Sequence, residues 1–103
     1  MLLTTTENIL GKSYEIIGLV KGSMIQTKHV GRDIGQGLKS LVGGELATYT
    51  EMMNESRAVA TKRMVEEAES KGADAIVMLR YGTSSIAQGA AEVIAYGTAV
   101  KYV

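Results

Sequence analysis

Cysteine, proline, phenylalanine and tryptophan are all absent from the 103 residues, and histidine occurs once. Without cysteine the chain cannot form a disulfide, a thiolate zinc site, an iron–sulfur cluster or a thiol nucleophile. The core must therefore be built from Ile, Val, Leu, Met and Ala, with some of the five Tyr. Small aliphatic side chains and 12 glycines favour close backbone packing over a large, aromatic-lined cofactor pocket.

Neither sign of charge dominates, since 11 Lys and Arg residues balance 11 Asp and Glu residues. Binding to nucleic acid or to an anionic membrane needs a basic cluster, and the longest basic run is Lys62-Arg63, so both partners are disfavoured. No apolar run approaches the roughly 20 residues that a membrane-spanning helix requires, and the first residues do not resemble a signal peptide. We expect one cytoplasmic domain over residues 1–103.

Hydrophobic periodicity predicts an α+β domain with the element order β-α-α-β-β. Residues 14–25 are apolar on both parities, which predicts a strand that is covered on both sides. Gly18 and Gly22 share one face of that strand and indicate a bulge or a close approach of another backbone. Residues 30–42 carry apolar residues at helical spacing and predict a first helix, whose glycines require it to be packed against a neighbour.

A long amphipathic helix is predicted from residue 45 or 48 to residue 71, with Gly72 as its stop. Residues 73–81 and 92–103 then predict two strands of an antiparallel hairpin, with the turn in residues 83–90. The apolar face of the long helix consists of Tyr49, Met52, Met53, Ser56, Val59, Ala60, Met64 and Ala68. A small three-stranded sheet with one such helix leaves strand edges exposed, so a symmetric ring of copies is expected.

Several short segments span nearly the whole chain in a fixed order. They are Thr4-Thr5-Thr6, Gly11-Lys12, Val20-Lys21-Gly22, Arg32-Asp33, Val42-Gly43-Gly44, Tyr49, Gly72-Ala73-Asp74-Ala75-Ile76-Val77 and Gly97-Thr98-Ala99-Val100-Lys101. Together they resemble the YbjQ-like family of small bacterial and archaeal proteins, which is labelled heavy-metal-binding and whose biochemical function is unestablished. The resemblance implies a dodecin-like α+β subunit in a pentameric ring, and it implies no reaction.

The heavy-metal label directs attention to His29 and Asp33. They are spaced i,i+4 at the opening of the predicted first helix and could share a face. Soft metals favour thiolate and imidazole ligands, so two ligands per chain make a divalent-metal site only if a ring brings copies together. The alternative is that His29 is a surface or interface residue and that Asp33 is favoured by the helix dipole. The Met residues at helical spacing are expected in the core.

Arg32, Asp33 and Tyr49 are also ligand or interface candidates. Arg32 could bind a carboxylate or a phosphate, or the pair Arg32-Asp33 could form an intersubunit or helix-capping salt bridge. Two further candidates depart from the pattern that the resemblance implies, since Arg80 stands where relatives often carry an acid and Glu92 where they usually carry an apolar residue. If the hairpin turns about residue 86, Arg80 and Glu92 lie opposite one another, which predicts a cross-strand ion pair.

Catalytic patterns are weak throughout. Gly11-Lys12-Ser13 lacks the upstream glycine and the preceding strand of a phosphate-binding loop. Ser84-Ser85 lies in the predicted turn without a nucleophile elbow, and the helix carboxylates read as a solvated surface. We therefore predict a non-enzymatic homo-oligomer, a pentamer by the resemblance, that binds or scaffolds a small ligand. The alternatives are metal handling at subunit interfaces and an enzyme whose site forms only between subunits.

Overall fold

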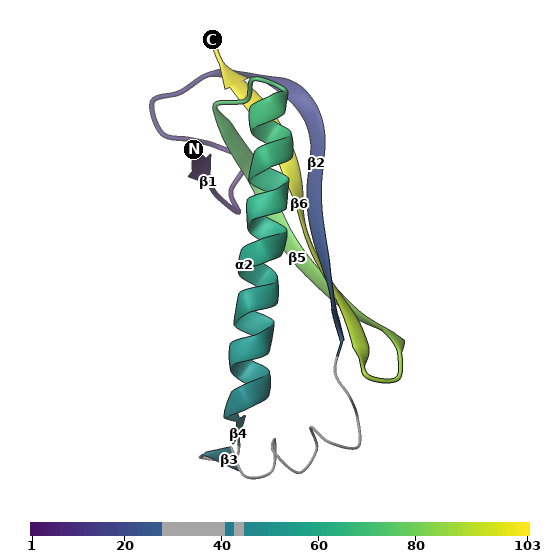
Figure 1. Ribbon diagram of the computed structural model, residues 1–103. Coiled ribbons are helices and arrows are strands. Elements are labelled where there is room, and N and C mark those ends of the chain that lie inside the picture. The colour runs from purple at the N-terminus through teal and green to yellow at the C-terminus, as the bar shows by residue number, and fades with distance from the viewer. Residues whose placement is uncertain (28–40, 43–44) are drawn as a thin grey trace.

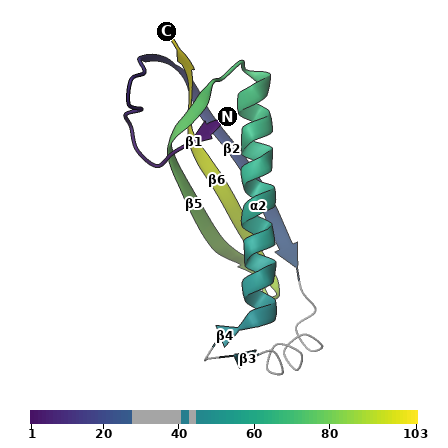
Figure 2. The same ribbon diagram turned by 90° about the vertical axis from the view of Figure 1, so that its left-hand side faces the viewer.

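The computed structural model describes residues 1–27, 41–42 and 45–103. Its elements, in chain order, are β1 (Leu2–Leu3), β2 (Tyr14–Thr27), β3 (Leu41–Val42), β4 (Glu45–Leu46), α2 (Ala47–Ser70), β5 (Ala75–Ala87) and β6 (Ala90–Tyr102). A four-stranded mixed sheet has the order β1-β5-β6-β2, and α2 lies across one of its faces (Figures 1 and 2). Strands β3 and β4 pair separately at the start of the helix. In this described part, no helix is long and apolar enough to cross a membrane.

Three predicted elements are confirmed. The strand expected over residues 14–25 is β2, and the long helix expected from residue 45 or 48 to 71 is α2. The last two strands pair antiparallel, and β2 lies beside β6, the second of them. The periodicity of long segments was sufficient here because each buries a regular stripe of side chains.

The predicted order differs in other parts. The first helix predicted over 30–42 falls mostly on residues 28–40, which lie outside the described part, and residues 41–42 form strand β3. The sheet has a fourth strand, β1, which pairs parallel with Ala75 and Ile76. Two residues are too few to show an alternation of apolar and polar side chains, so β1 is recognised only by its pairing with β5. The sheet and its helix therefore run β-β-α-β-β.

The hairpin turn lies within the predicted range of 83–90 but only at its end. Strand β5 continues to Ala87, and β6 begins at Ala90. Between them Gly89 has a φ of 75°, which glycine adopts at little cost. The turn is therefore set by Gly89, and Ser84-Ser85 lies within a strand.

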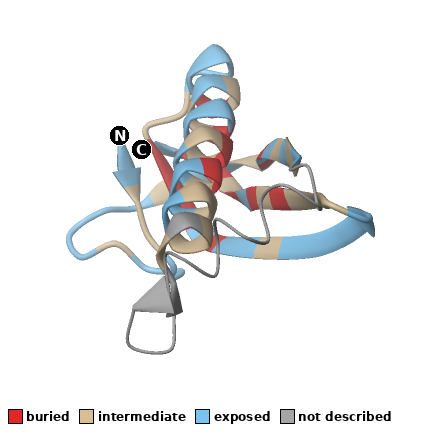
Figure 3. Cartoon of the chain, turned by 60° about the horizontal axis from the view of Figure 1, so that its bottom comes forward, coloured by how far each residue is buried: buried red, intermediate tan, exposed pale blue. Residues whose placement is uncertain are grey.

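The face of the sheet that contacts α2 is the inner face, and it holds the main core. Its buried cluster comprises Val20, Ala60, Met64, Ala68, Ile76, Leu79, Val93, Ala95 and Ala99. Figure 3 shows the buried residues of α2 on the side that meets the sheet. Small residues at the contact bring helix and sheet close together: a Cβ built on Gly22 would overlap the backbone atoms Ala60 O and Met64 N. Close backbone approach at Gly22, one of the two predicted explanations of these glycines, is confirmed.

The other predicted explanation, a bulge, is found at Gly18. The register of β2 against β6 shifts between Ile16 and Gly18, and Gly18 has a φ of 145°. A second shift interrupts β5 between Val77 and Arg80, where Met78 has a φ of 56°. A left-handed conformation is costly for a side chain such as methionine, so surrounding contacts must hold it. The Met78 amide donates to Thr6 O at 3.2 Å.

The end of α2 follows its sequence signal. Gly72 has a φ of 77°, the Gly72 amide donates to Glu69 O, and the Ala73 amide donates to Ala68 O. This pair of bonds is a Schellman motif, which satisfies the last helical carbonyls and turns the chain. Strand β5 can therefore start at Ala75, two residues after Ala73.

The opposite, outer face of the sheet is covered only at one end. There Ala75, Val77 and Val100 form a second buried cluster, against which Ile9 of the loop 4–13 packs. The remainder carries exposed apolar side chains, since Ile16 is 70% and Leu19 64% exposed. The described residues of one chain thus leave much of the outer face of β2 exposed, and the predicted cover on that side is not found among them. Strand β2 also forms the edge of the sheet.

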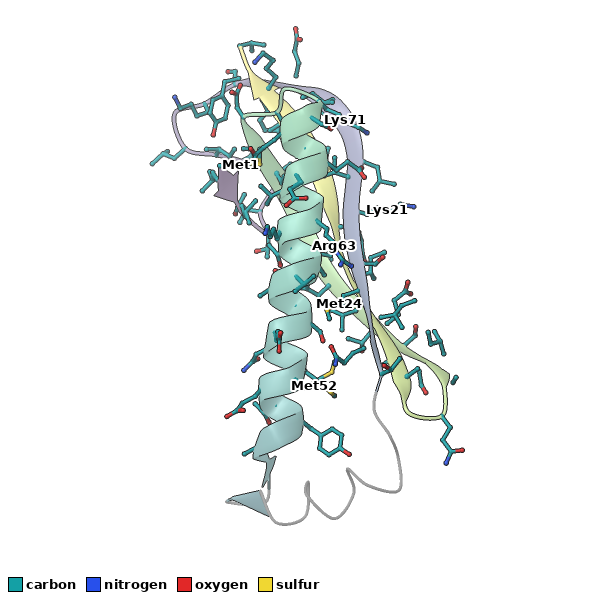
Figure 4. All side chains as sticks on the ribbon, in the orientation of Figure 1. Met1, Lys21, Met24, Met52, Arg63 and Lys71 are labelled. Carbon is teal, nitrogen blue, oxygen red and sulfur yellow. The ribbon has the colours of Figure 1, made fainter. Side chains whose placement is uncertain are left out.

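Among the described residues, a side chain of α2 reaches the backbone of the edge strand β2. Arg63 of α2 donates through Nη1 to Ser23 O at 2.7 Å, and Figure 4 shows Arg63 between the helix and β2. The Ser23 carbonyl therefore points away from β6. Because outward and inward backbone groups alternate along an antiparallel strand, those of Lys21 and Ile25 also point outward. A row of hydrogen-bonding groups is left on this edge of the described sheet.

Candidate ligand-binding site

A cavity of about 420 Å³ lies where β1 ends beside β5, and we call it the edge pocket. It is lined by Leu3, Thr4, Thr5, Leu79 and Tyr81. Leu79 belongs to the buried core cluster and Leu3 packs against that cluster, so the apolar part of the lining is continuous with the core. The volume lies within the range of roughly 300–1,000 Å³ that is usual for small-molecule sites.

Backbone hydrogen bonds hold the segment after β1 against β5 and so shape this pocket. The Thr4 amide donates to Ile76 O at 3.0 Å, and the Leu79 amide donates to Thr4 O at 3.0 Å. The bulge at Met78 lets both the Met78 and the Leu79 amides reach this segment. A short parallel pairing that would be marginal alone is thereby fixed in place.

Arg80 is not a lining residue of the edge pocket, but its guanidinium is bonded to two residues that are. Its Nη1 donates to Thr5 O at 3.0 Å and to Leu79 O at 2.8 Å, and both acceptors belong to lining residues. Two other described cations are in ion pairs, Lys71 with Glu67 and Lys101 with Asp74. Among the described residues no carboxylate lies within ion-pair distance of Arg80. The guanidinium is positioned but its charge is not neutralised.

The hydroxyl groups of the edge pocket differ in the hydrogen bonds that they can still form. Thr61 Oγ1 donates to Arg57 O at 2.7 Å, so the Tyr81 hydroxyl, 2.7 Å from Thr61 Oγ1, is the donor between them. The Tyr81 oxygen can then accept a hydrogen bond. Thr4 Oγ1 is engaged with Thr6 inside the loop. The Thr5 hydroxyl has no partner among the described residues.

A second, smaller cavity of about 220 Å³ opens on the outer face, and we call it the outer pocket. Its lining consists of Glu7, Tyr14, Ile16, Val77, Met78 and Thr98. The Tyr14 hydroxyl donates to Glu7 O at 2.7 Å and anchors the loop over it. Met78, held in its left-handed conformation, forms part of this wall and is 41% exposed.

Comparison with known proteins places the chain in a family. Residues 1–103 match a family model named YbjQ and described as "Putative heavy-metal-binding". A UPF0145 protein of Clostridium novyi is 65% identical over 101 residues, which is 98% of each chain. A UPF0145 protein of Alkaliphilus metalliredigens is 57% identical over 103 residues, covering 100% of each. This chain belongs to the YbjQ family.

The resemblance drawn from the short sequence segments is thereby confirmed. A solved structure also shares the fold: a protein with unknown function of the DUF74 family from Pediococcus pentosaceus, with a TM-score of 0.74. It is 20% identical, and the alignment covers 100% of this chain and 98% of that chain. At this identity the likeness bears on the fold alone.

The description of the YbjQ family mentions heavy metals, which makes the ligand chemistry of this member relevant. Within residues 1–27, 41–42 and 45–103, no group of three or more His, Asp or Glu side chains could hold a metal ion. Cysteine is absent from the chain. The residues that the structure describes therefore do not fit a metal site, and the candidates His29 and Asp33 lie outside them.

The remaining sequence candidates fall in different parts of the YbjQ fold. Arg32 lies outside the described residues, as Asp33 does, and Tyr49 is half-buried near the start of α2. Of the candidates within the described residues, Arg80 is the one bonded to residues that line the edge pocket. Sequence reasoning missed Thr5 and Tyr81, because no local pattern links residues so far apart in the chain.

The predicted ion pair between Arg80 and Glu92 is wrong. Arg80 lies opposite Tyr96, and Glu92 lies opposite Ser84. The turn is centred near Gly89 and not at residue 86, which moves every partner along the strand. Arg80 therefore bonds to the segment after β1, on the opposite side of β5 from β6.

Proposed function

We propose that this YbjQ-family protein is a non-enzymatic homo-oligomer, a pentameric ring of dodecin-like subunits, that binds a small ligand. The observation that carries the proposal is the edge and outer face of β2, which the described residues leave largely uncovered. Leu19 and Ile25 are 64% and 56% exposed, and they lie on the same strand as the outward-facing backbone groups. A long, apolar edge strand is a liability for a protein that acts alone.

The two edges of the sheet differ, and this favours a ring over a dimer. Strand β2 forms one edge along its 14 residues, whereas the other edge is β5 beyond the two residues of β1. Pairing the β2 edge of one copy with a different surface of the next is a heterologous contact. Such contacts close into a ring when the rotation between copies allows it.

Light scattering coupled to size exclusion tests the assembly. A pentamer has a mass of about 55 kDa, five times the 11.0 kDa of one chain. A single species at that mass, unchanged on tenfold dilution, is the expected result. A monodisperse 11.0 kDa species would contradict the proposal, because the edge of β2 would then be tolerated in solution.

A second candidate function, metal binding with ligands contributed at subunit interfaces, is favoured by the description of the family. The one histidine and its i,i+4 partner would have to meet their copies across the ring. Calorimetry with zinc, copper and nickel separates this candidate from the first. Saturable binding that is lost in His29→Ala supports it, whereas no saturable binding, or binding unchanged in His29→Ala, excludes it.

A further inference from the structure

We propose that the edge pocket takes an organic oxyanion, a carboxylate or phosphate group on a compact apolar body, with Arg80 as the residue that binds the charged group. This inference rests on the small-ligand part of the proposed function. It does not depend on assembly, because every residue that it uses lies within one chain.

The apolar lining of the edge pocket favours a ligand with a compact apolar body. Leu79 is 6% exposed, and Leu3 packs on the same cluster, so this wall is rigid. None of the five lining residues is charged. A ligand that fills this space therefore gains by burying carbon atoms against Leu3 and Leu79.

The positive charge of Arg80, which is bonded to the carbonyls of two lining residues, determines which head group can bind. Both hydrogen bonds of Arg80 use Nη1 and end on neutral carbonyls, those of Thr5 and Leu79. In the described part of the chain, Nε and Nη2 have no acceptor and no carboxylate is paired with the group. Adjacent guanidinium N–H groups match the two oxygens of a carboxylate or phosphate, and an ammonium group would be repelled.

Two hydroxyl groups can complete the head-group contacts. The Thr5 hydroxyl has no partner among the described residues, and Thr5 O is the carbonyl that Arg80 binds. The Tyr81 oxygen, whose own proton goes to Thr61, can accept from the P–OH of a singly protonated phosphate but offers no donor to a carboxylate. Thr5 thus lies next to the guanidinium, and the apolar wall lies on the core side.

A purely structural role for Arg80 makes a different prediction. If Arg80 only ties the segment after β1 to β5, its replacement lowers stability and the pocket shows no preference for the charge of a ligand. If it binds a head group, the unmodified protein discriminates between ligands of opposite charge. The first experiment therefore needs no variant.

Nuclear magnetic resonance titration of the full-length protein compares hexanoate, hexyl phosphate, hexylamine and inorganic phosphate. Hexanoate or hexyl phosphate should bind saturably and shift the amides of Leu3, Thr5, Leu79 and Tyr81. Hexylamine should bind at least tenfold more weakly than these two oxyanions. Inorganic phosphate should also bind more weakly than hexanoate or hexyl phosphate, because it buries no carbon. The stronger of the two hexyl oxyanions identifies the head group.

Equal binding of hexylamine and hexanoate would overturn the proposal, as would shifts confined to Tyr14, Ile16 and Thr98 of the outer pocket. Absence of saturable binding by any hexyl compound would overturn it as well. Arg80→Gln should weaken oxyanion binding at least tenfold and Arg80→Lys less. Lys62→Gln, which removes one exposed positive charge on α2, should leave binding unchanged.

The melting temperature of each variant is measured alongside, because Arg80 also holds the segment after β1. Tyr81→Phe keeps Arg80 and both of its carbonyl bonds, and it should weaken hexyl phosphate binding two- to fivefold while leaving hexanoate binding unchanged. Unchanged oxyanion binding in Arg80→Gln rejects the assignment. Light scattering on the same samples separates this result from the assembly: a monomer that binds hexanoate refutes only the ring.

Discussion

The two faces of the sheet in this protein are built from different kinds of residue. At the inner face, Val20 and Gly22 of β2 are buried under α2, together with Ala60 and Met64 of the helix. At the outer face, the alternating neighbours in the same strand, Leu19 and Ile25, are large, apolar and exposed. One strand thus combines a face that is complete within the chain and a face that is not.

This difference shows where the fold of one copy ends. Small residues on the inner face let the backbones of α2 and β2 come into contact, so that interface has no room for anything else. On the outer face, the described residues form a buried cluster under Ile9 at one end of the sheet. Lys21, which Figure 4 shows extending from β2 away from α2, is the charged residue between the two exposed apolar ones.

The largest effect is expected from adding a methyl group to the inner face. Gly22→Ala places a Cβ on the backbone atoms Ala60 O and Met64 N, which cannot rotate away, so α2 must shift. We expect a loss of about 3 kcal/mol or more in the free energy of unfolding, measured by urea denaturation. Gly82→Ala is the control, because its Cβ meets only the Ile94 Cγ2 methyl at 3.3 Å. Similar losses in both variants would contradict the comparison.

A cavity in the inner core should have the next largest effect. Met64 is fully buried between α2 and the sheet. Met64→Ala is therefore expected to lower the free energy of unfolding by about 2–4 kcal/mol, through lost burial and an incompletely closed cavity. Leu10→Ala, at a fully exposed position in the loop, should change it by about 0.5 kcal/mol at most. Thermal or urea unfolding of both variants measures the difference.

A charge on the outer face should act on assembly and little on folding. Leu19→Asp puts a carboxylate on the exposed apolar part of β2, where the folded single chain has space for it. The mass by light scattering should fall to that of one chain, while the far-ultraviolet circular dichroism stays unchanged. Leu10→Asp introduces the same charge away from β2 and should leave the mass unaltered. If Leu19→Asp unfolds the chain, the outer face is already part of its core.

The smallest effect is expected at Met78, where the bulge of β5 holds a left-handed residue. Met78→Gly removes the steric cost of the positive φ but adds freedom to the unfolded chain, so a gain of up to about 1 kcal/mol is expected. Met78→Val should instead be destabilising, since a β-branched residue tolerates this conformation least. Melting temperatures of the two variants in opposite directions would support this account, and equal shifts would reject it.

Much of the fold could be read from the sequence because its elements are long and regular. The 24 residues of α2 carry Ser56, Ala60, Met64 and Ala68 at intervals of four, and all four are buried as the pattern requires. Gly72 ended the helix as its residue type predicts. By contrast, strand β1 has two residues and no pattern, and the predicted turn was displaced to Gly89.

The candidate site was less accessible to sequence reasoning. Arg80 was singled out as a candidate, but its predicted partner Glu92 was wrong, because one shift of the turn changes every pairing along a hairpin. The hydrogen bond from Arg80 to Thr5 joins residues 75 positions apart. No periodicity carries information over that distance.

The sequence by itself determined the regular elements, the antiparallel hairpin and the glycines that serve as a bulge and as a close contact. It could do so because burial of an apolar stripe and left-handed backbone geometry are local properties of the chain. The tertiary structure alone decided strand β1, the strand register, the edge pocket and the place of Arg80. Those features depend on backbone hydrogen bonds between distant segments and on bulges at Gly18 and Met78, which shift the register after the chain has folded together.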